Sequence, residues 1–203
     1  ILILLQRRHP LLNPLIKSLK DLQIPVSGVD RMVLTEQLIV RDLLALLQIM
    51  LQPHDDLTFA ALLKSPLFAL GEQDLFALAH GRDGLSLYQR LETSDAIDPA
   101  IKDYMHAIFD LYQNGAGPYQ LLSFVTNRPC PADGLSGRHA LIKRLGFDAQ
   151  DALDELLNTA MAYEQSETPD IQRFLHDLRQ QDADIKRDVS NEQVNNVRIM
   201  TVH

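Results

Sequence analysis

Apolar residues along this chain recur mainly at helical spacing, while short apolar runs with a strand-like character stand at its two ends. Over most of the interior, apolar positions three and four residues apart alternate with polar ones, which is typical of amphipathic helices. One helix is predicted to begin at Thr35, with Glu36 in its first turn, and to end at residues 53–56. The other predicted helices cover residues 11–22, 57–63, 72–80, 99–113, 118–126, 138–145, 149–164 and 170–180.

Three segments predict strands. Residues 1–5 form a continuous apolar run that fits a buried parallel strand or a piece of helix, and its brevity and abrupt polar end favour the strand. Residues 24–28 contain Ile24 before a proline, which disfavours helical geometry. Residues 195–203 alternate and are rich in β-branched side chains. Strand, helix and strand in this order begin an α/β unit.

Local signals mark where the predicted helices start and stop. Pro99, Pro118 and Pro169 stand near helix starts, where the missing N–H of proline costs nothing. Asp56 is expected to cap the helix over residues 57–63. Residues 127–137 are rich in proline and glycine and are interpreted as a loop.

Composition agrees with a folded, mainly α-helical chain. Of its 203 residues, 46% are hydrophobic and 23% charged, which is ordinary for a globular protein and excludes global disorder. Aromatic residues make up only 6% and tryptophan is absent, so the core is built from Leu, Ile, Val and Ala. A core rich in Leu and Ala favours helices over sheets.

The net charge of −8 argues against a general nucleic-acid-binding surface, although a local strip of contacts stays possible. Cys130 is the single cysteine and lies in a predicted loop without metal-ligand spacing, which indicates a reducing, cytoplasmic setting. The apolar run over residues 1–5 is too short for a signal sequence or a membrane span.

Other candidate sites are better explained by structure. Residues 54–56 and 176–177 pair histidine with aspartate, but neighbours on a helix or cap rarely converge on a metal, so no metal site is predicted. Residues 134–137 fall short of the Gly-x-Ser-x-Gly pattern of a nucleophile elbow. The basic pairs at 143–144 and 186–187 could line a DNA path, yet such short pairs are usually solvated.

The two ends of the chain resemble motifs of the UvrD/Rep superfamily of DNA helicases. Residues 3–7, followed by a helix and by Ile24 and Pro25, resemble motif IV, and residues 197–203 resemble the first half of motif V. Between them, residues 34–47 and 53–57 are similar to the helix and turn that open the inserted helical subdomain.

Other segments resemble the AddA-type subunit of helicase–nucleases that repair double-strand breaks. These are residues 60–68, 74–79 and 185–188. In simpler family members a Gly-Ile-Gly turn that grips duplex DNA follows the position of Pro66. Only Gly71 of that turn is kept here. The phosphate-binding loop, the Mg²⁺-binding carboxylates and the second half of motif V have no match.

The resemblance implies an internal fragment that runs from motif IV to the start of motif V. Residues 1–30 would belong to the second RecA-like motor lobe, residues 31–190 to a helical inserted subdomain, and residues 191–203 to the strand that returns to the motor lobe. The expected fold is therefore mainly α, with short flanking β-strands from a RecA-like α/β lobe.

The resemblance also implies the site residues. Arg7, with Arg8 as the one-off alternative, would reach the ATP phosphates, and Thr201 and His203 would contact the backbone of single-stranded DNA. The parent protein would use ATP and Mg²⁺ on single-stranded DNA and duplex junctions. It would work beside a second helicase–nuclease subunit, with a possible exonuclease domain. The fragment alone is expected to be inactive.

Three alternatives stay open at this stage. Arg7 and Arg8 would also suit a solvated strand end, and Thr201 and His203 a plain strand with a frayed terminus. The chain as a whole would also suit a helical interaction module that binds a partner subunit without touching DNA.

Overall fold

The chain folds into two compact units, one formed by residues 1–33 with 180–203 and the other by residues 34–179. The computed structural model describes residues 1–5, 11–22, 24, 26–27, 33–147, 149–166, 168–190 and 197–201.

The first unit contains a small parallel sheet. Its strands are β1 (Leu2–Leu5), β2 (Val26–Ser27) and β3 (Val197–Thr201), and helix α1 (Leu12–Asp21) connects β1 to β2. The strand order is β1-β3-β2, so the strand from the far end of the sequence lies between the other two. Leu2 pairs with Arg198 and Leu5 with Thr201, which places the carboxyl ends of β1 and β3 side by side.

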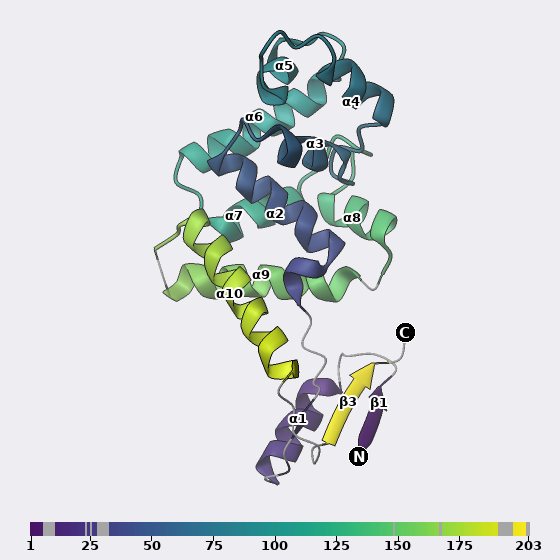
Figure 1. Cartoon of the computed structure of the whole chain (residues 1–203), viewed down its shortest axis with the longest axis vertical. Coiled ribbons are helices and arrows are strands. Elements are labelled where there is room, and N and C mark those ends of the chain that lie inside the picture. Colours follow the sequence, from purple (N-terminus) through teal and green to yellow (C-terminus); the bar gives the residue numbers. More distant parts are fainter. Residues whose placement is uncertain are drawn as a thin grey trace. The chain divides into compact units, whose positions relative to one another are not determined.

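The second unit is helical. A 3₁₀ turn, η1, covers Leu34–Glu36, and the helices follow in chain order (Figure 1). They are α2 (Leu38–Leu51), α3 (Asp56–Lys64), α4 (Glu72–Ala79), α5 (Leu87–Thr93), α6 (Pro99–Gln113), α7 (Pro118–Asn127), α8 (Gly137–Leu145), α9 (Ala149–Ser166) and α10 (Ile171–Ser190), whose last turns belong to the first unit.

Helix α2 is the centre of the helical unit. It contacts η1, α3, α7, α8 and α9, and Leu38 and Arg41 are the only exposed residues on it. A helix that is apolar almost all round must be enclosed by others. Its buried side chains are Ile39, Val40, Leu43, Leu44, Leu46, Leu47, Ile49 and Met50.

The mainly α-helical fold with short flanking strands that the sequence predicts is confirmed. The prolines at 99 and 118 each occupy the first turn of a helix, as expected. Residues 128–136 form the predicted loop, which an isolated bridge between Pro129 and Ser136 closes.

Three element predictions were wrong. The helix expected from Thr35 begins instead at Leu38, after the 3₁₀ turn, and its N-cap Gln37 makes no side-chain capping bond. Helix α10 continues to Ser190 rather than ending near residue 180. Helix α5 was missed altogether, because its seven residues are too few to show a clear period.

Gly137 allows α8 to begin directly against α7. A Cβ atom at this position would stand 2.0 Å from the carbonyl oxygen of Val125 and 2.8 Å from Leu67 Cδ2. Because both neighbours lie in packed helices or their buried flanks, neither has room to withdraw.

We expect Gly137→Ala to lower the free energy of unfolding by about 2 to 4 kcal/mol, through overpacking against the α7 backbone. Gly134→Ala is the matched control, since a Cβ there meets nothing within 4 Å and only its φ of +69° is unfavourable. Gly134→Ala should lower the free energy of unfolding by only about 1 kcal/mol. Urea unfolding of both variants measures the difference, and equal losses would contradict the steric explanation.

A second prediction concerns Asp42, a half-buried carboxyl on α2. Burial raises its pKa to about 6, and the neighbouring Arg41 only partly offsets this. Since the folded state holds this proton more tightly than the unfolded state, the stability contributed by the proton is present below pH ~4 and is lost as pH rises through about 6.

Asp42→Asn should therefore be more stable than the parent at pH 7, by about 1 to 2 kcal/mol, and this advantage should shrink toward pH 4. Asp103→Asn, at an exposed position on α6, removes the same charge and serves as control. Denaturation between pH 4 and pH ~7.5 measures the effect, and a pH-independent difference would count against it.

Candidate functional site

In the sequence, the candidate ATP-binding and DNA-binding residues stand at or just after the ends of two adjacent strands. Thr201 is the last described residue of β3 and pairs with Leu5, the last residue of β1. Arg7, Arg8 and His203 lie outside the described residues, as does the Thr201 side chain. What the structure adds is the sheet order, which brings the ends of β1 and β3 to one edge of a parallel sheet. Such edges are where α/β sheets bind ligands.

The acidic turn at residues 54–56 is a helix start, but its capping residue is not the predicted one. Asp55, rather than Asp56, is the N-cap of α3: its carboxylate accepts from the Thr58 N–H at 3.2 Å and from Thr58 Oγ1 at 2.6 Å. These hydrogen bonds from the Thr58 hydroxyl and N–H hold the pKa of Asp55 below its usual range.

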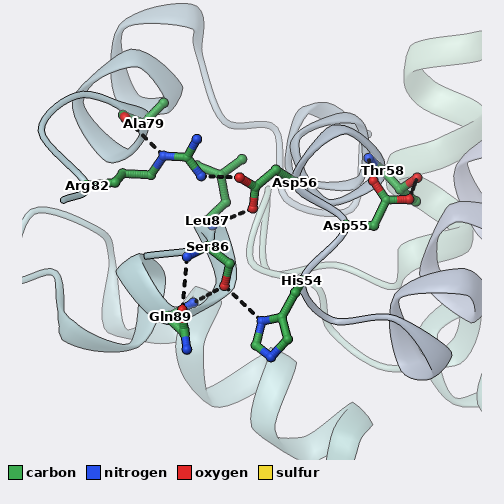
Figure 2. Close-up of polar contacts among 9 residues, drawn as sticks. All are labelled: His54, Asp55, Asp56, Thr58, Ala79, Arg82, Ser86, Leu87 and Gln89. Carbon is green, nitrogen blue, oxygen red and sulfur yellow. Dashed lines mark hydrogen bonds and ion pairs between the residues drawn. The ribbon is translucent and has the colours of Figure 1, made fainter. Parts of the chain in front are cut away.

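Asp56 has a longer-range role. Its carboxylate forms an ion pair with Arg82 and accepts the Leu87 N–H at 2.7 Å (Figure 2). Partial burial acts to raise the pKa of Asp56, but the hydrogen bonds from Arg82 and from the Leu87 N–H outweigh it, so the pKa lies below its usual range. Arg82 Nε also donates to the Ala79 carbonyl at 3.1 Å. Asp56 thus joins the start of α3 to the end of α4 and the start of α5.

His54 and Ser86 complete this network without forming a catalytic pair. His54 Nδ1 lies 2.9 Å from Ser86 Oγ, and Figure 2 shows the imidazole pointing at that hydroxyl. Ser86 Oγ also accepts the Gln89 N–H at 3.2 Å, while Gln89 Oε1 accepts the Ser86 N–H at 2.9 Å. This reciprocal capping box starts α5. The Ser-x-x-Gln pattern was the sequence signal that could have revealed the missed helix.

The loop before α8 gathers a second group of polar side chains. Asp133 lies 3.3 Å from His139 Nδ1 and 3.6 Å from Lys143 Nζ, and its carboxylate also accepts the Leu135 N–H at 3.0 Å. That backbone hydrogen bond, with the hydrogen bond to His139 and the nearby Lys143 ammonium, holds the pKa of Asp133 below its usual range. Ser136 caps α8 by accepting the His139 N–H, so residues 134–137 are a helix start rather than a nucleophile elbow.

Cys130 is buried in the same loop. Its Sγ lies 3.8 Å from Asp133 Oδ1, and burial raises the pKa of the thiol. A buried thiol of raised pKa is a poor nucleophile, so Cys130 packs in the core and is not a reactive cysteine.

The described residues contain neither a metal-binding cluster nor a membrane-spanning helix. In that part of the chain no group of three or more His, Cys, Asp or Glu side chains is arranged to hold a metal ion. None of the helices described there is both long enough and apolar enough to cross a membrane.

Comparison with known proteins gives a distant relation. No protein-family model matches the chain. It is 25% identical over 199 residues to an ATP-dependent helicase/nuclease subunit of Enterococcus faecalis strain ATCC 700802 / V583. The match covers 91% of this chain but only 15% of that protein, so the chain spans a small part of its relative's length. This supports a distant helicase-family relation along almost the whole chain.

The Asp56 network leads to a prediction about local stability. Asp56→Ala removes the acceptor of the Leu87 N–H and the partner of Arg82, so we expect the free energy of unfolding to fall by about 1 to 3 kcal/mol. Asp55→Ala, which removes the same charge one residue earlier, should cost about 1 kcal/mol through loss of the helix cap.

Hydrogen exchange separates the two variants. The amide of Leu87 should lose protection in Asp56→Ala and keep it in Asp55→Ala, because only Asp56 bonds that amide. Unchanged protection of Leu87 in Asp56→Ala would show that α5 is held by its other contacts.

Proposed function

We propose that this chain is a section of the motor of an ATP-dependent DNA helicase or translocase that acts in double-strand-break repair. The observation that carries the proposal is the match to a helicase/nuclease subunit over 91% of the chain. The sequence resemblance to motifs IV and V at the two ends adds to it, since these motifs belong to one motor lobe.

The sheet topology supports the same proposal. The segment that resembles motif IV contains β1, and the segment that resembles motif V contains β3. These strands are neighbours and parallel although about 190 residues separate them in sequence. A motor lobe that carries a long insertion needs this arrangement, because the chain must leave its sheet and return to it.

Arg7 is proposed as the residue that contacts the ATP phosphates. In the sequence it stands two residues after Leu5, the last residue of β1. A guanidinium holds phosphate oxygens with two parallel hydrogen bonds and stabilises the charge that develops during phosphoryl transfer. Arg8 is the alternative. The chain contains no Gly-Lys phosphate-binding loop, so other parts of the parent protein would hold ATP and Mg²⁺.

Thr201 and His203 are proposed as contacts to the backbone of single-stranded DNA. Thr201 ends β3 at the same sheet edge as Leu5. Hydrogen bonds to DNA phosphates position a strand without selecting its sequence, which suits a translocating enzyme. The proposed ATP-contacting residue would then come after β1 and the proposed DNA-contacting residues would stand at the end of the adjacent strand β3. A movement of this lobe would therefore shift the ATP contact and the DNA contacts together.

A second candidate function, binding of a partner subunit by the helical unit, rests on exposed apolar side chains. Leu57 on α3 and Phe76 on α4 are 83% and 67% exposed. Such an interface would weaken little with salt, whereas phosphate contacts weaken steeply. In a two-subunit helicase–nuclease the two functions are compatible.

Arg7→Ala in the full-length protein is expected to lower DNA-stimulated ATP hydrolysis by ~10³-fold or more, because an arginine finger contributes at least that much. Arg8→Ala is the matched control and should change turnover by less than about tenfold. Steady-state ATPase assays with single-stranded DNA measure both. A loss confined to Arg8→Ala would move the role to Arg8, and near-parental turnover in both variants would remove it from this strand end.

A further inference from the structure

The outward surface of α8 differs in charge from the rest of the chain. Residues 137–147 contain three Lys or Arg side chains, one His and no Asp or Glu, in a chain of net charge −8. These side chains are Arg138, His139, Lys143 and Arg144. Acidic residues resume at position 148, so the basic stretch is bounded.

Packing turns these cations toward solvent. The inner side of α8 carries Gly137, Ala140 and Leu141, all buried, where the helix contacts α2, α7 and α9 (Figure 1). Lys143 and Arg144 are exposed, and the Lys143 side chain keeps 65% of its accessible surface. The helix is therefore amphipathic, with an apolar side in the core and a cationic side in water.

The ion pairs already present leave this surface positive. Arg138 pairs with Asp154 of α9 at 2.7 Å. The same Asp133 Oδ2 lies 3.3 Å from His139 Nδ1 and 3.6 Å from Lys143 Nζ. The Arg144 side chain has no ion pair or hydrogen bond within the part of the chain that the structure describes. Exposed ion pairs of this kind contribute little to stability, so a phosphate can replace Asp133 as the partner of Lys143 at little cost.

An exposed aromatic ring follows the cations. Phe147, three residues beyond Arg144, is 75% exposed. Its Cα lies within about 11 Å of the Arg144 Cα by chain length alone. Large aromatic side chains are normally buried. An exposed ring that follows lysine and arginine within a few residues is a combination that single-stranded nucleic acids bind, with phosphates on the cations and a base stacked on the ring.

We infer that the α8 surface, defined by Lys143, Arg144 and Phe147, binds single-stranded DNA. Lys143 and Arg144 contact phosphates and Phe147 stacks on a base. An acidic protein segment would satisfy the cations but would leave the ring without a planar partner, so single-stranded nucleic acid fits better. This contact lies on the helical unit and is independent of Arg7 and of ATP, so it goes beyond the motor function proposed above.

Fluorescence anisotropy of a labelled oligothymidylate of about 15 nucleotides, titrated with the 203-residue chain without ATP, tests the inference. At about 100 mM salt, the double variant Lys143→Ala/Arg144→Ala should raise Kd by about tenfold or more. It should also flatten the slope of log K against log salt by about 1.4, which corresponds to two lost phosphate contacts. Phe147→Ala should raise Kd by about fivefold or more through lost stacking.

Matched controls come from the same helical unit. Arg41→Ala/Lys64→Ala removes two other exposed cations, and Phe76→Ala removes another exposed ring. Both should bind as the parent does, and circular dichroism melts establish that every variant is folded. Loss of binding in the α8 variants alone supports the inference.

Three outcomes would overturn it. They are absence of oligothymidylate binding even at about 50 mM salt, equal weakening in the control variants, and preferential binding of a polyglutamate peptide with the same dependence on Lys143 and Arg144. The last outcome would assign the surface to an acidic protein partner. The ATPase test of Arg7 reads the motor proposal without reference to this surface. A loss of binding confined to the α8 variants distinguishes this surface from the contacts proposed at Thr201 and His203.

Discussion

Burial of α2 on nearly every side is the constraint on which the helical unit depends. Its eight buried apolar side chains have no face to turn to water, so helices α3, α7, α8 and α9 must surround it. Surrounding one helix closely leaves little room between the outer helices. The missing side chain of Gly137 lets α8 reach the α7 backbone in that crowded space. Gly117 also lacks room for a side chain, because a Cβ there would stand 2.3 Å from Glu164 Oε1.

Polar side chains accept hydrogen bonds from backbone N–H groups at helix N-termini, which apolar packing alone would leave without partners. The N-terminus of α7 has a glycine cap without a side chain, and Glu164 of α9 supplies the acceptor for the Tyr119 N–H at 2.7 Å. Asp56 does the same for Leu87 at the start of α5. In both cases a carboxylate from a distant element satisfies a helix N-terminus, where its charge also suits the helix dipole. These contacts add to the local signals at the same helix starts, which are the Ser86 capping box of α5 and Pro118 of α7.

The charge distribution is compatible with the proposed DNA contacts only if these are confined to a few places on the surface. A net charge of −8 is incompatible with a surface that attracts nucleic acid everywhere. It is compatible with contacts confined to the edge where β1 and β3 end and to the cationic side of α8, where basic residues are concentrated. Acidic residues elsewhere would then keep DNA from binding at other positions on the helical unit.

Sequence alone determined the elements whose signals are local. Apolar spacing and the prolines at 99 and 118 located most helices to within a few residues. Helical periodicity and the fixed φ of proline depend only on residues that are close in sequence. The motif resemblance selected Arg7, Arg8, Thr201 and His203 as candidates. The choice between Asp55 and Asp56 as the cap of α3 rests on a local contact with Thr58, which two adjacent aspartates leave open in the sequence. Only the tertiary structure decided that β3 lies between β1 and β2 and that Asp56 reaches Arg82 and Leu87. Those arrangements join residues that are far apart in sequence, so no local signal specifies them.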